Sequence, residues 1–425
     1  MSAPSAGPRA GWSSEDAERH LLAREQFGMR FGLDRMRRML NVVGLPRPSF
    51  PTIHVVGTNG KSSTTRMIAA LLAGEGLRVG CFTSPHLLSY RERIQIDGRD
   101  IAPERFAAAI ARVLRAGDLV DRTASPEGDV VTQFELLTAA ALLEFEAEAV
   151  DVAVIEAGLG GRFDATNVVD SRVAVLTNVG LEHTRYLGPT VADIAREKLD
   201  VVRAGATLVV GAGLDRDAMA LARATAAERG ATLVTSTAAV EVELRSGGGY
   251  QRRNFAAALS AATAFLGREP SRDNVVAVAA ELVVRGRFEV LAGRPVTLLD
   301  GAHNDGGIEA LAESLPAFAA GRPLVAVVSI LDDKDAAGML RRLLVHCEAV
   351  VCTACTSPRA LPAATLASLV GQIGGAEAVV VAGPHRALAR AREMAGEDGV
   401  VLATGSIYLI ADLMRPENAG GGSTL

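Results

Sequence analysis

The sequence has few cysteines, no long apolar run and no excess of basic charge. Four cysteines among 425 residues do not require a disulfide framework, and a reducing cytoplasm is the expected compartment. No uninterrupted apolar stretch is long enough to cross a bilayer, and the first residues lack the apolar centre of a secretory signal. The formal net charge of −5 provides no basic face for nucleic acid. We therefore expect a cytoplasmic protein with neither membrane nor nucleic-acid partners.

Length and composition predict two or three globular domains. Hydrophobic residues make up 49% and charged residues 22% of the sequence, which are ordinary shares for a globular protein. One CxxC pair, Cys352 and Cys355, lies close to His346 and Cys347 and raises the question of a zinc or redox site. No second pair accompanies it in the sequence, and residues 350–353 have the pattern of a buried strand, so packing is the preferred interpretation.

Apolar, β-branched runs alternate with Ala-, Leu- and Arg-rich helical stretches along the whole chain. The runs are continuous rather than alternating, which indicates parallel strands that helices cover on both faces. The fold class is therefore α/β. The expected strands are Thr52–Val56, Asp151–Ile155, Arg172–Leu176, Ala206–Val210, Ala231–Val234, Val296–Leu299, Leu324–Ile330, Ala349–Cys352, Ala378–Val381 and Val400–Ala403.

A domain boundary is expected near Arg287–Arg294, because a new series of β/α units begins at Val296. Residues 20–290 would then form an N-terminal domain and residues 291–415 a smaller C-terminal domain. Residues 1–19, which begin with a Ser-, Ala-, Gly- and Pro-rich stretch, and residues 416–425 are expected to be flexible.

A strand, a glycine turn and a helix follow one another around a lysine. The strand Thr52–Val56 leads into Gly-Thr-Asn-Gly-Lys-Ser-Ser, and a helical pattern follows. Backbone N–H groups at such a helix start point toward an anion, and the lysine adds a mobile positive charge. The motif predicts that a nucleoside triphosphate is bound by Gly57, Thr58, Asn59, Gly60, Lys61, Ser62 and Ser63.

This loop is shorter than the common Walker A motif, whose first glycine is replaced here by Val55. An ordinary strand-to-helix turn, in which glycine supplies a positive φ, is the alternative interpretation. The lysine and the two hydroxyl residues that follow it in order favour the phosphate loop.

Polar residues follow other apolar runs at the same expected sheet edge, which is where ligands bind in open parallel sheets. Glu156 ends one strand, His183 lies in the loop after the next, and Ser84 follows a third apolar run. A carboxylate at the end of an apolar strand is costly unless it is paired or binds a metal. Mg²⁺ beside a triphosphate is the expected partner, with Ser84 preferred to His86 as a ligand. The alternatives are a turn cap for Glu156 and a structural role for His183.

Two further groups are less specific. Lys198 lies on an expected helix, where a solvated lysine is the ordinary case, and spacing alone does not reveal carbamylation. In the second half, Asp300 and His303 follow a strand, and Arg287 precedes them at the expected domain boundary. Charged groups at that boundary would close over a bound nucleotide, whereas a surface salt bridge is the alternative for Arg287.

In combination, the motifs resemble those of the folylpolyglutamate synthase/dihydrofolate synthase family, within the Mur ligase group. The resemblance extends from about Phe27 to Tyr408, almost the whole chain, and rests on several independent motifs. They are HVVGTNGK (54–61), FTSPHL (82–87), RERI (91–94), TQFE (132–135), GLGGRFDATN (158–167), LGPT (187–190), IAREK (194–198), GRFE (286–289), DGAHN (300–304) and DKD (333–335).

The resemblance implies an N-terminal P-loop-type ATPase domain that also binds pteroate, and a smaller, Rossmann-like C-terminal ligase domain. It implies ATP-driven amide formation, in which ATP phosphorylates a carboxylate of the pterin substrate and the amino group of glutamate displaces the phosphate. The implied small-molecule partners are ATP, L-glutamate and either dihydropteroate or a reduced folate. Two Mg²⁺ sites are implied, and a monovalent cation is a further candidate. We expect the protein to be a monomer.

Site roles carry over from the matching motifs. The residues with implied catalytic roles are Lys61, Glu156, His183 and Lys198. The implied magnesium ligands are Ser84, Glu156, His183 and a carbamylated Lys198. Besides the phosphate loop, the implied ATP contacts are Asn254, Arg287, Asp300 and His303. The implied pteroate contacts are Thr132, Phe163, Asp164 and Ala165.

The chain departs from the family pattern at several positions. Ser62 replaces the glycine that usually follows the loop lysine, and would either add a metal ligand or tighten the loop. Tyr250 replaces the histidine of a His-Gln-x-x-Asn motif that ends here at Asn254, and Glu182 replaces an aspartate before His183. None of these changes removes an implied catalytic group, so we expect an active enzyme.

Three functions remain open at this point. The leading one is an ATP-dependent ligase that joins glutamate to dihydropteroate, extends folate polyglutamates, or does both. A second is a related amide ligase that acts on a different, non-folate acid. A third is a nucleotide-binding regulatory protein without catalysis. This function is disfavoured because the chain retains all four implied catalytic residues, Lys61, Glu156, His183 and Lys198.

Overall fold

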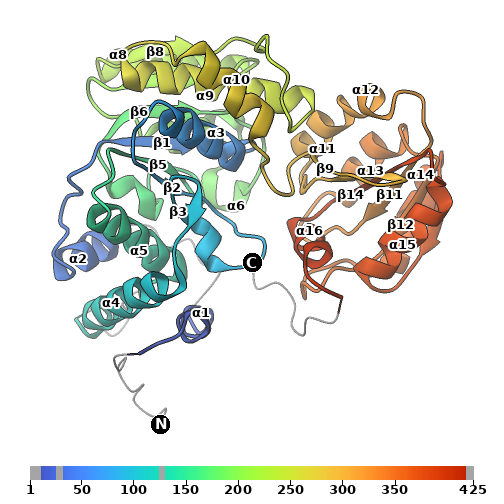
Figure 1. Cartoon of the computed structure of the whole chain (residues 1–425), viewed down its shortest axis with the longest axis horizontal. Helices are drawn as coiled ribbons and strands as arrows, with labels where there is room; N and C mark the ends of the chain where they lie inside the picture. Colours follow the sequence, from blue (N-terminus) through green and yellow to red (C-terminus); the bar gives the residue numbers. More distant parts are fainter. Residues whose placement is uncertain (1–10, 25–31, 124–129, 418–425) are drawn as a thin grey trace. The chain divides into compact units, whose positions relative to one another are not determined.

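The computed structural model of the chain describes residues 11–24, 32–123 and 130–417 (Figure 1). The first ten residues, the tail from residue 418 and the motif around Phe27, about which the sequence makes predictions, lie outside the described residues. The chain divides into two compact units, one formed by Met1–Ala238 with Phe255–Val278 and the other by Ala239–Asn254 with Ala279–Leu425. None of the helices in the described ranges is long and apolar enough to cross a membrane.

The first unit is built on an eight-stranded sheet with the order β4-β3-β2-β5-β1-β6-β7-β8. Strands β2, β5, β1, β6, β7 and β8 are parallel neighbours, and β3 and β4 extend one edge as antiparallel strands. The carboxyl ends of β5, β1 and β6 therefore meet at the centre of one sheet edge. The strands are β1 (Thr52–Val56), β2 (Val79–Phe82), β3 (Ile94–Ile96), β4 (Arg99–Asp100), β5 (Val152–Glu156), β6 (Ser171–Leu176), β7 (Thr207–Val210) and β8 (Thr232–Thr235).

Helices cover both faces of this sheet. In Figure 1, α3 lies on one face above β1 and β5, and α4 and α5 lie on the opposite face. The helices are α1 (Ser14–Leu22), α2 (Asp34–Val42), α3 (Lys61–Gly74), α4 (Pro103–Arg122), α5 (Gln133–Ala147), α6 (Thr184–Leu187), α7 (Val191–Leu199), α8 (Arg216–Glu228), α9 (Gly249–Leu266) and α10 (Arg272–Glu281). Two short 3₁₀ helices are η1 (Tyr90–Arg93) and η2 (Ala165–Val168).

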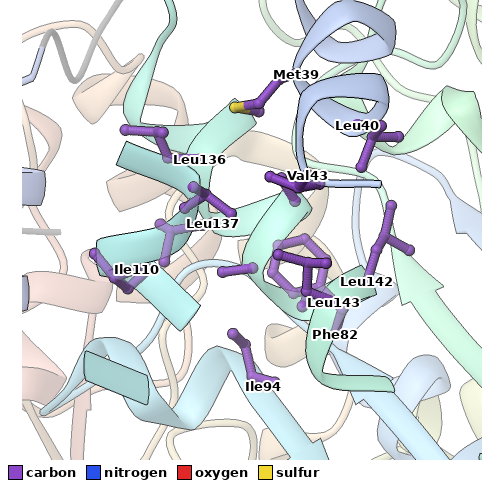
Figure 2. Packing of buried hydrophobic residues seen from close by; sticks show 14 of the residues in the cluster. Met39, Leu40, Val43, Phe82, Ile94, Ile110, Leu136, Leu137, Leu142 and Leu143 are labelled. Atoms are coloured by element: carbon purple, nitrogen blue, oxygen red, sulfur yellow. The ribbon is translucent and has the colours of Figure 1, made fainter. Parts of the chain in front are cut away.

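The core explains why the central strands read as continuous apolar runs. Every residue of β1 and β5 is buried, as parallel strands between two helix layers require. Figure 2 shows side chains of α2, α4 and α5, such as Leu40, Ile110 and Leu137, packed around Phe82 and Ile94. Burying one such side chain contributes about 1.5–3 kcal/mol. This rigid platform fixes the strand ends that carry the polar residues.

Helix α1 lies within a segment that the sequence predicts to be flexible. Ser13 accepts a hydrogen bond from the amide of Asp16, whose carboxylate accepts one from the amide of Ser13 in return. Ala17 and Leu21 on the inner face of the helix are fully buried. The prediction of a flexible segment is therefore wrong for residues 14–19, because a capping box and buried apolar contacts stabilise a helix there.

Glu75, at the end of α3, ties this helix to the segment before α10 and to the first turn of α10. Its carboxylate accepts hydrogen bonds from the amide of Ser271 at 2.8 Å, from Arg268 Nη1 at 2.7 Å and from Asn274 Nδ2 at 2.9 Å. These donors, the Ser271 amide foremost, lower the pKa of Glu75 from 4.5 to about 2. The ionised form of the carboxylate is therefore the one that holds the two segments together.

We expect Glu75→Gln to remove an acid-sensitive part of the stability. Because the folded pKa lies below the unfolded value of 4.5, the contribution is complete above that pH and is lost as the pH falls toward about 2. The stability difference between wild type and variant should therefore shrink across this window. Urea unfolding at a series of pH values measures it, with Glu281→Gln on the exposed face of α10 as the control. A difference that stays constant with pH would contradict the proposed ionised clamp.

The second unit is a separate α/β sheet with the order β13-β12-β11-β14-β10-β9. Its strands are parallel apart from the antiparallel edge strand β9. The strands are β9 (Glu289–Leu291), β10 (Val296–Leu299), β11 (Leu324–Val328), β12 (Ala349–Cys352), β13 (Glu377–Val380) and β14 (Val400–Thr404). The helices are α11 (Asp305–Ala312), α12 (Leu315–Ala319), α13 (Ala336–Leu344), α14 (Ala363–Ile373), α15 (Pro384–Ala395) and α16 (Ile407–Met414).

The α/β class predicted from the sequence is confirmed, and the ten expected strands are all present, three with the expected bounds and seven with shifted ends. Strand β2 is not among the ten expected strands, although the sequence marked an apolar run that ends at Phe82. The short antiparallel strands β3, β4 and β9 were not expected either, because two or three residues are too few to show a pattern. The second unit also begins earlier than the expected C-terminal domain, since α9 and α10 each pass from one unit into the other. Cys347, Cys352 and Cys355 are buried with free thiols, as packing residues would be.

Candidate active site

The phosphate loop joins the central strand β1 to helix α3. The strand ends at Val56 and the helix begins at Lys61, with Gly60 as its N-cap at φ 81°, a left-handed conformation that suits glycine. At Gly57 a Cβ would stand 1.8 Å from Thr177 Oγ1, so only glycine fits there. The start of α3 thus directs free N–H groups toward the place where the sequence predicts phosphate binding.

Residues 177–180, which follow the neighbouring strand β6, hold the loop in place. The carbonyl oxygen of Asn178 accepts a hydrogen bond from the Thr58 amide at 3.1 Å, and its Oδ1 accepts one from the Asn59 amide at 2.8 Å. Thr177 Oγ1 donates to the Asn59 carbonyl at 2.6 Å, and Thr58 Oγ1 accepts from the Gly180 amide at 3.0 Å. Sequence reasoning assigned Asn178 no role, although its position directly after a strand at the ligand edge was a usable signal.

Lys61 and Lys198 converge on the same backbone oxygen. Lys61 Nζ donates to the Gly57 carbonyl at 3.0 Å and to the Thr58 carbonyl at 3.1 Å. Lys198, on α7, donates to the Gly57 carbonyl at 2.9 Å and is only 4% exposed. Burial, followed by the positive charge of Lys61, lowers the pKa of Lys198 from 10.5 to about 7. The interpretation of Lys198 as a solvated helix lysine is therefore wrong.

Glu156 is the last residue of β5 and is 1% exposed. Its Oε1 accepts a hydrogen bond from the Ser62 hydroxyl at 2.8 Å, and its Oε2 accepts one from the Ser84 amide at 3.0 Å. A buried carboxylate beside hydroxyl oxygens fits a hard divalent cation such as Mg²⁺. Within the described ranges no three His, Cys, Asp or Glu side chains form a metal-binding group. A metal here would therefore need further ligands, such as the hydroxyl, water or phosphate oxygens that Mg²⁺ prefers.

A pocket opens beside the phosphate loop. His183 reaches it as the N-cap of α6, in a left-handed conformation with φ 51°, and its side chain is 42% exposed. His183 Nε2 lies 4.0 Å from the Glu182 carboxylate. Sequence reasoning noted Glu182 only as a departure from the family, whereas the structure places it in the pocket lining. The predicted site residues in the lining are Gly57, Thr58, Lys61, His183 and Lys198.

Residues 158–160 form another wall of this pocket, and helix α5 supports them. Thr132, predicted to contact pteroate, is the N-cap of α5, where its side chain accepts a hydrogen bond from the Glu135 amide at 3.2 Å. Phe134, in the first turn of α5, lies against the glycine loop, because a Cβ on Gly158 would stand 2.7 Å from its ring. The motif containing Phe134 was recognised in the sequence, but this aromatic ring was assigned no role.

The other predicted pteroate contacts, Phe163, Asp164 and Ala165, lie where this loop returns to the core. Asp164 is buried, and its carboxylate accepts hydrogen bonds from the amides of Leu159 at 2.8 Å and Thr166 at 3.0 Å. Burial raises the pKa of Asp164. Phe163 is half-buried and Ala165 is buried. The carboxylate of Asp164 therefore holds both ends of its own loop.

The second unit contains Asp300, which follows β10 and is buried. Its carboxylate accepts hydrogen bonds from the Tyr250 hydroxyl and from the amides of Phe288 and Ala302, the latter two at 2.8 Å. Burial raises the pKa of Asp300, and burial together with the charge of Asp300 raises that of Tyr250. Tyr250, which replaces the usual histidine, is thus a direct partner of Asp300.

The remaining predicted ATP contacts lie in the same unit. Asn254 Nδ2 donates to Gln251 Oε1 at 2.9 Å, and Gln251 Nε2 donates to the Arg287 carbonyl at 3.1 Å. A Cβ on Gly301 would stand 2.2 Å from Arg287 Nη1, and His303 Nδ1 lies 2.8 Å from the Gly301 carbonyl, to which it donates. Arg287 and His303 thus lie at the turn that follows β10, and Asn254 is linked to Arg287 through Gln251.

Comparison with known proteins supports the family resemblance that the sequence motifs indicate. Residues 286–407 match the family model "Mur ligase, glutamate ligase domain". The dihydrofolate synthase/folylpolyglutamate synthase of Mycobacterium tuberculosis is 35% identical over 384 residues, covering 82% of this chain and 79% of that protein. This chain belongs to the dihydrofolate synthase/folylpolyglutamate synthase family.

Solved structures of dihydrofolate synthase/folylpolyglutamate synthase family members share the fold across nearly the whole chain. M. tuberculosis folylpolyglutamate synthase complexed with ADP has a TM-score of 0.87 at 31% identity, covering 96% of this chain and 99% of that one. A bifunctional folylpolyglutamate synthase/dihydrofolate synthase with Mn, AMPPNP and L-glutamate bound has a TM-score of 0.82 at 29% identity, with coverages of 96% and 99%. The fold predicted from the family resemblance is thereby confirmed.

Proposed function

We propose that the protein is an ATP-dependent ligase that joins L-glutamate to dihydropteroate, to the γ-carboxylate of a reduced folate, or to both. The observation that carries this proposal is the convergence of two lysines on the phosphate loop of a chain from this family. Lys61 and Lys198 donate to one loop carbonyl, and both line the pocket beside it. The positive charge of Lys61 suits a transferring phosphoryl group, and the buried Lys198, whose pKa is lowered to about 7, lies beside it.

The proposed reaction has two steps, because the carboxylate of the pterin substrate is a poor electrophile until it is phosphorylated. A carboxylate oxygen of the pterin substrate attacks the γ-phosphorus of ATP, and ADP leaves, which produces an acyl phosphate. The amino nitrogen of glutamate then attacks the acyl carbon, loses a proton and expels inorganic phosphate, which leaves an amide. The contribution of the protein is positioning and charge neutralisation, by Lys61 and by the free N–H groups at the start of α3.

We propose that Ser84, Glu156 and His183 hold Mg²⁺, with Lys198 serving a second ion as a carbamate. Bound Mg²⁺ supplies charge neutralisation and orientation to the phosphates. Glu156 is held ready for this role by Ser62 and Ser84, each of which donates a hydrogen bond to one of its carboxylate oxygens. Ser62 is thus a hydrogen-bond partner of the proposed metal ligand Glu156.

We propose that Thr132 and residues 163–165 face the pterin substrate, and that Asn254, Arg287, Asp300 and His303 contact ATP. The first unit would thus contribute the pterin contacts, and the second unit would contribute these contacts to ATP. We also propose a cytoplasmic monomer, since four buried free thiols suit a reducing compartment.

Carbamylation of Lys198 should depend on pH in a defined direction. The neutral amine attacks CO₂, forming an N–C bond and releasing a proton, so the reaction needs the unprotonated lysine. With a pKa of about 7, most of Lys198 is neutral near pH 8 and most is protonated near pH 6. In bicarbonate, mass spectrometry of the native protein should show one added CO₂ near pH 8 and much less near pH 6. Lys198→Met should abolish the added mass, and its persistence in that variant would assign it to another residue.

The test of the proposed function is a product assay. Phosphate release is measured with Mg·ATP and L-glutamate, with dihydropteroate or tetrahydrofolate as acceptor, and the products are weighed by mass spectrometry. One glutamate added to dihydropteroate alone indicates a dihydrofolate synthase, addition to both acceptors a bifunctional enzyme, and addition to tetrahydrofolate alone a polyglutamylase. No addition to either acceptor would refute the folate assignment and favour a ligase for another acid.

A further inference from the structure

One buried histidine lies on β1 but is not used by the proposed chemistry. His54 is completely buried in the strand that leads into the phosphate loop. Its Nε2 lies 2.8 Å from Thr166 Oγ1, whereas its Nδ1 is buried and has no hydrogen-bond partner. An unpaired buried polar atom destabilises the fold, so a histidine at this position is expected to have a role that offsets this cost.

The contact with Thr166 continues to the glycine-rich loop. Thr166 Oγ1 is hydrogen-bonded to Asp164 Oδ1, and the Thr166 amide donates to the same oxygen at 3.0 Å. The other oxygen, Oδ2, accepts from the Leu159 amide at 2.8 Å. His54, Thr166 and Asp164 therefore form a chain from the central strand to residues 158–160 of the pocket wall.

The direction of the hydrogen bonds in this chain follows from the donors. The carboxylate of Asp164 can only accept, and it accepts hydrogen bonds from the amides of Leu159 and Thr166. The Thr166 hydroxyl must therefore donate its proton to this carboxylate. The Thr166 oxygen must then accept from His54, which requires a proton on Nε2. The opposite tautomer would bury an N–H group at Nδ1 without an acceptor, and such orphan donors are rare. Both arguments give the same tautomer.

We propose that His54 is a positioning residue, neutral with its proton on Nε2, that fixes the pterin-binding loop through Thr166 and Asp164. This inference extends the proposed function. The assignment of the pterin acid to this loop rests on that proposed function. Without the chain, the Asp164 carboxylate could turn and release the amide of Leu159. The loop would then sample other conformations, and the apparent affinity for the pterin acid would fall in proportion to the competent fraction.

The test compares Thr166→Val, which removes the hydroxyl at nearly constant shape, with Thr166→Ser, which keeps it. We expect Thr166→Val to raise the KM for the accepted pterin acid about tenfold. The KM for ATP should change less than about twofold, and Thr166→Ser should stay near wild type in both. His54→Gln, which keeps a donor near the Nε2 position, should retain a lower pterin KM than His54→Leu. A general loss of structure would instead lower kcat and thermal stability without this selectivity.

Nitrogen NMR of the histidine-labelled wild type tests the tautomer without any substrate. We expect His54 to show a protonated Nε2 and an unprotonated Nδ1, unchanged between about pH 5 and pH 8, since burial lowers its pKa to about 3. A proton on Nδ1, or equal pterin KM values for Thr166→Val and Thr166→Ser in an active enzyme, would overturn the inference. A wild type that glutamylates neither dihydropteroate nor tetrahydrofolate would refute the proposed function, while the NMR result would still decide the tautomer.

Discussion

Lys61→Met should lower kcat for ATP-dependent phosphate release by about a thousandfold. Loss of a preorganised donor to a developing negative charge typically reduces kcat by about 10²–10³, and here the lost group also carries a full charge. Methionine has a similar length and favours helices, so α3 should still begin at this residue. Steady-state kinetics with varied Mg·ATP gives the effect, and thermal unfolding checks that the fold is intact.

The control for this prediction is Lys61→Arg, which keeps the charge but replaces a compact ammonium with a planar fork. We expect an intermediate rate, because the loop carbonyls of Gly57 and Thr58 surround a single Nζ atom. If Lys61→Met kept more than about a third of the wild-type kcat/KM for ATP, the strand-to-helix turn would have no phosphate role. The alternative interpretation of the motif as an ordinary glycine turn would then be preferred.

Glu156→Gln should weaken divalent metal binding by at least about a hundredfold and abolish most ligase activity. The change removes one negative charge from a buried ligand while keeping its shape, and Mg²⁺ sites depend on charged oxygens. The amide oxygen of glutamine can still accept from the Ser84 amide, whereas its NH₂ group would face the Ser62 hydroxyl. Mn²⁺ titration in the presence of a non-hydrolysable ATP analogue measures affinity separately from catalysis.

Glu144→Gln is the matched control for this experiment. Glu144 is a buried carboxylate of α5 that pairs with Arg105 at 2.5 Å. It lies outside the proposed metal site, so its loss should change stability but leave the Mn²⁺ affinity unaltered. Equal Mn²⁺ affinities for wild type and Glu156→Gln would show that Glu156 is a turn cap, the alternative that its contact with the Ser84 amide also permits.

The phosphate loop could be predicted from the sequence because the residues that form it are consecutive. A glycine turn, a lysine and hydroxyl groups after an apolar strand are sufficient to predict an anion site. Glu156 was recognisable because an acidic residue ends an otherwise apolar run. The chain contains only three lysines, Lys61, Lys198 and Lys334, against an abundance of arginine. That scarcity could have drawn attention to Lys198 without any family resemblance.

The environment of Lys198 could not be predicted from its own helix. Its burial depends on α7 packing against the loop after β5, where a Cβ on Gly161 would stand 2.8 Å from the Lys198 carbonyl oxygen. Its hydrogen-bond partner, Gly57, is 141 positions away in the sequence. The pKa of about 7 is a consequence of this packing, since desolvation acts through neighbours that no local pattern reveals.

The sequence by itself determined the α/β class, ten of the strands in their order along the chain, and the phosphate loop, because these depend on short-range periodicity and on consecutive motifs. It did not determine the helix at residues 14–19, the clamp of Asn178 on the loop or the chain from His54 to Asp164. Those features arise where parallel strands bring together side chains more than a hundred positions apart, as in the contacts of Asn178 with Asn59 and of His54 with Thr166. Such contacts are decided by strand order and register, which only the tertiary structure supplies.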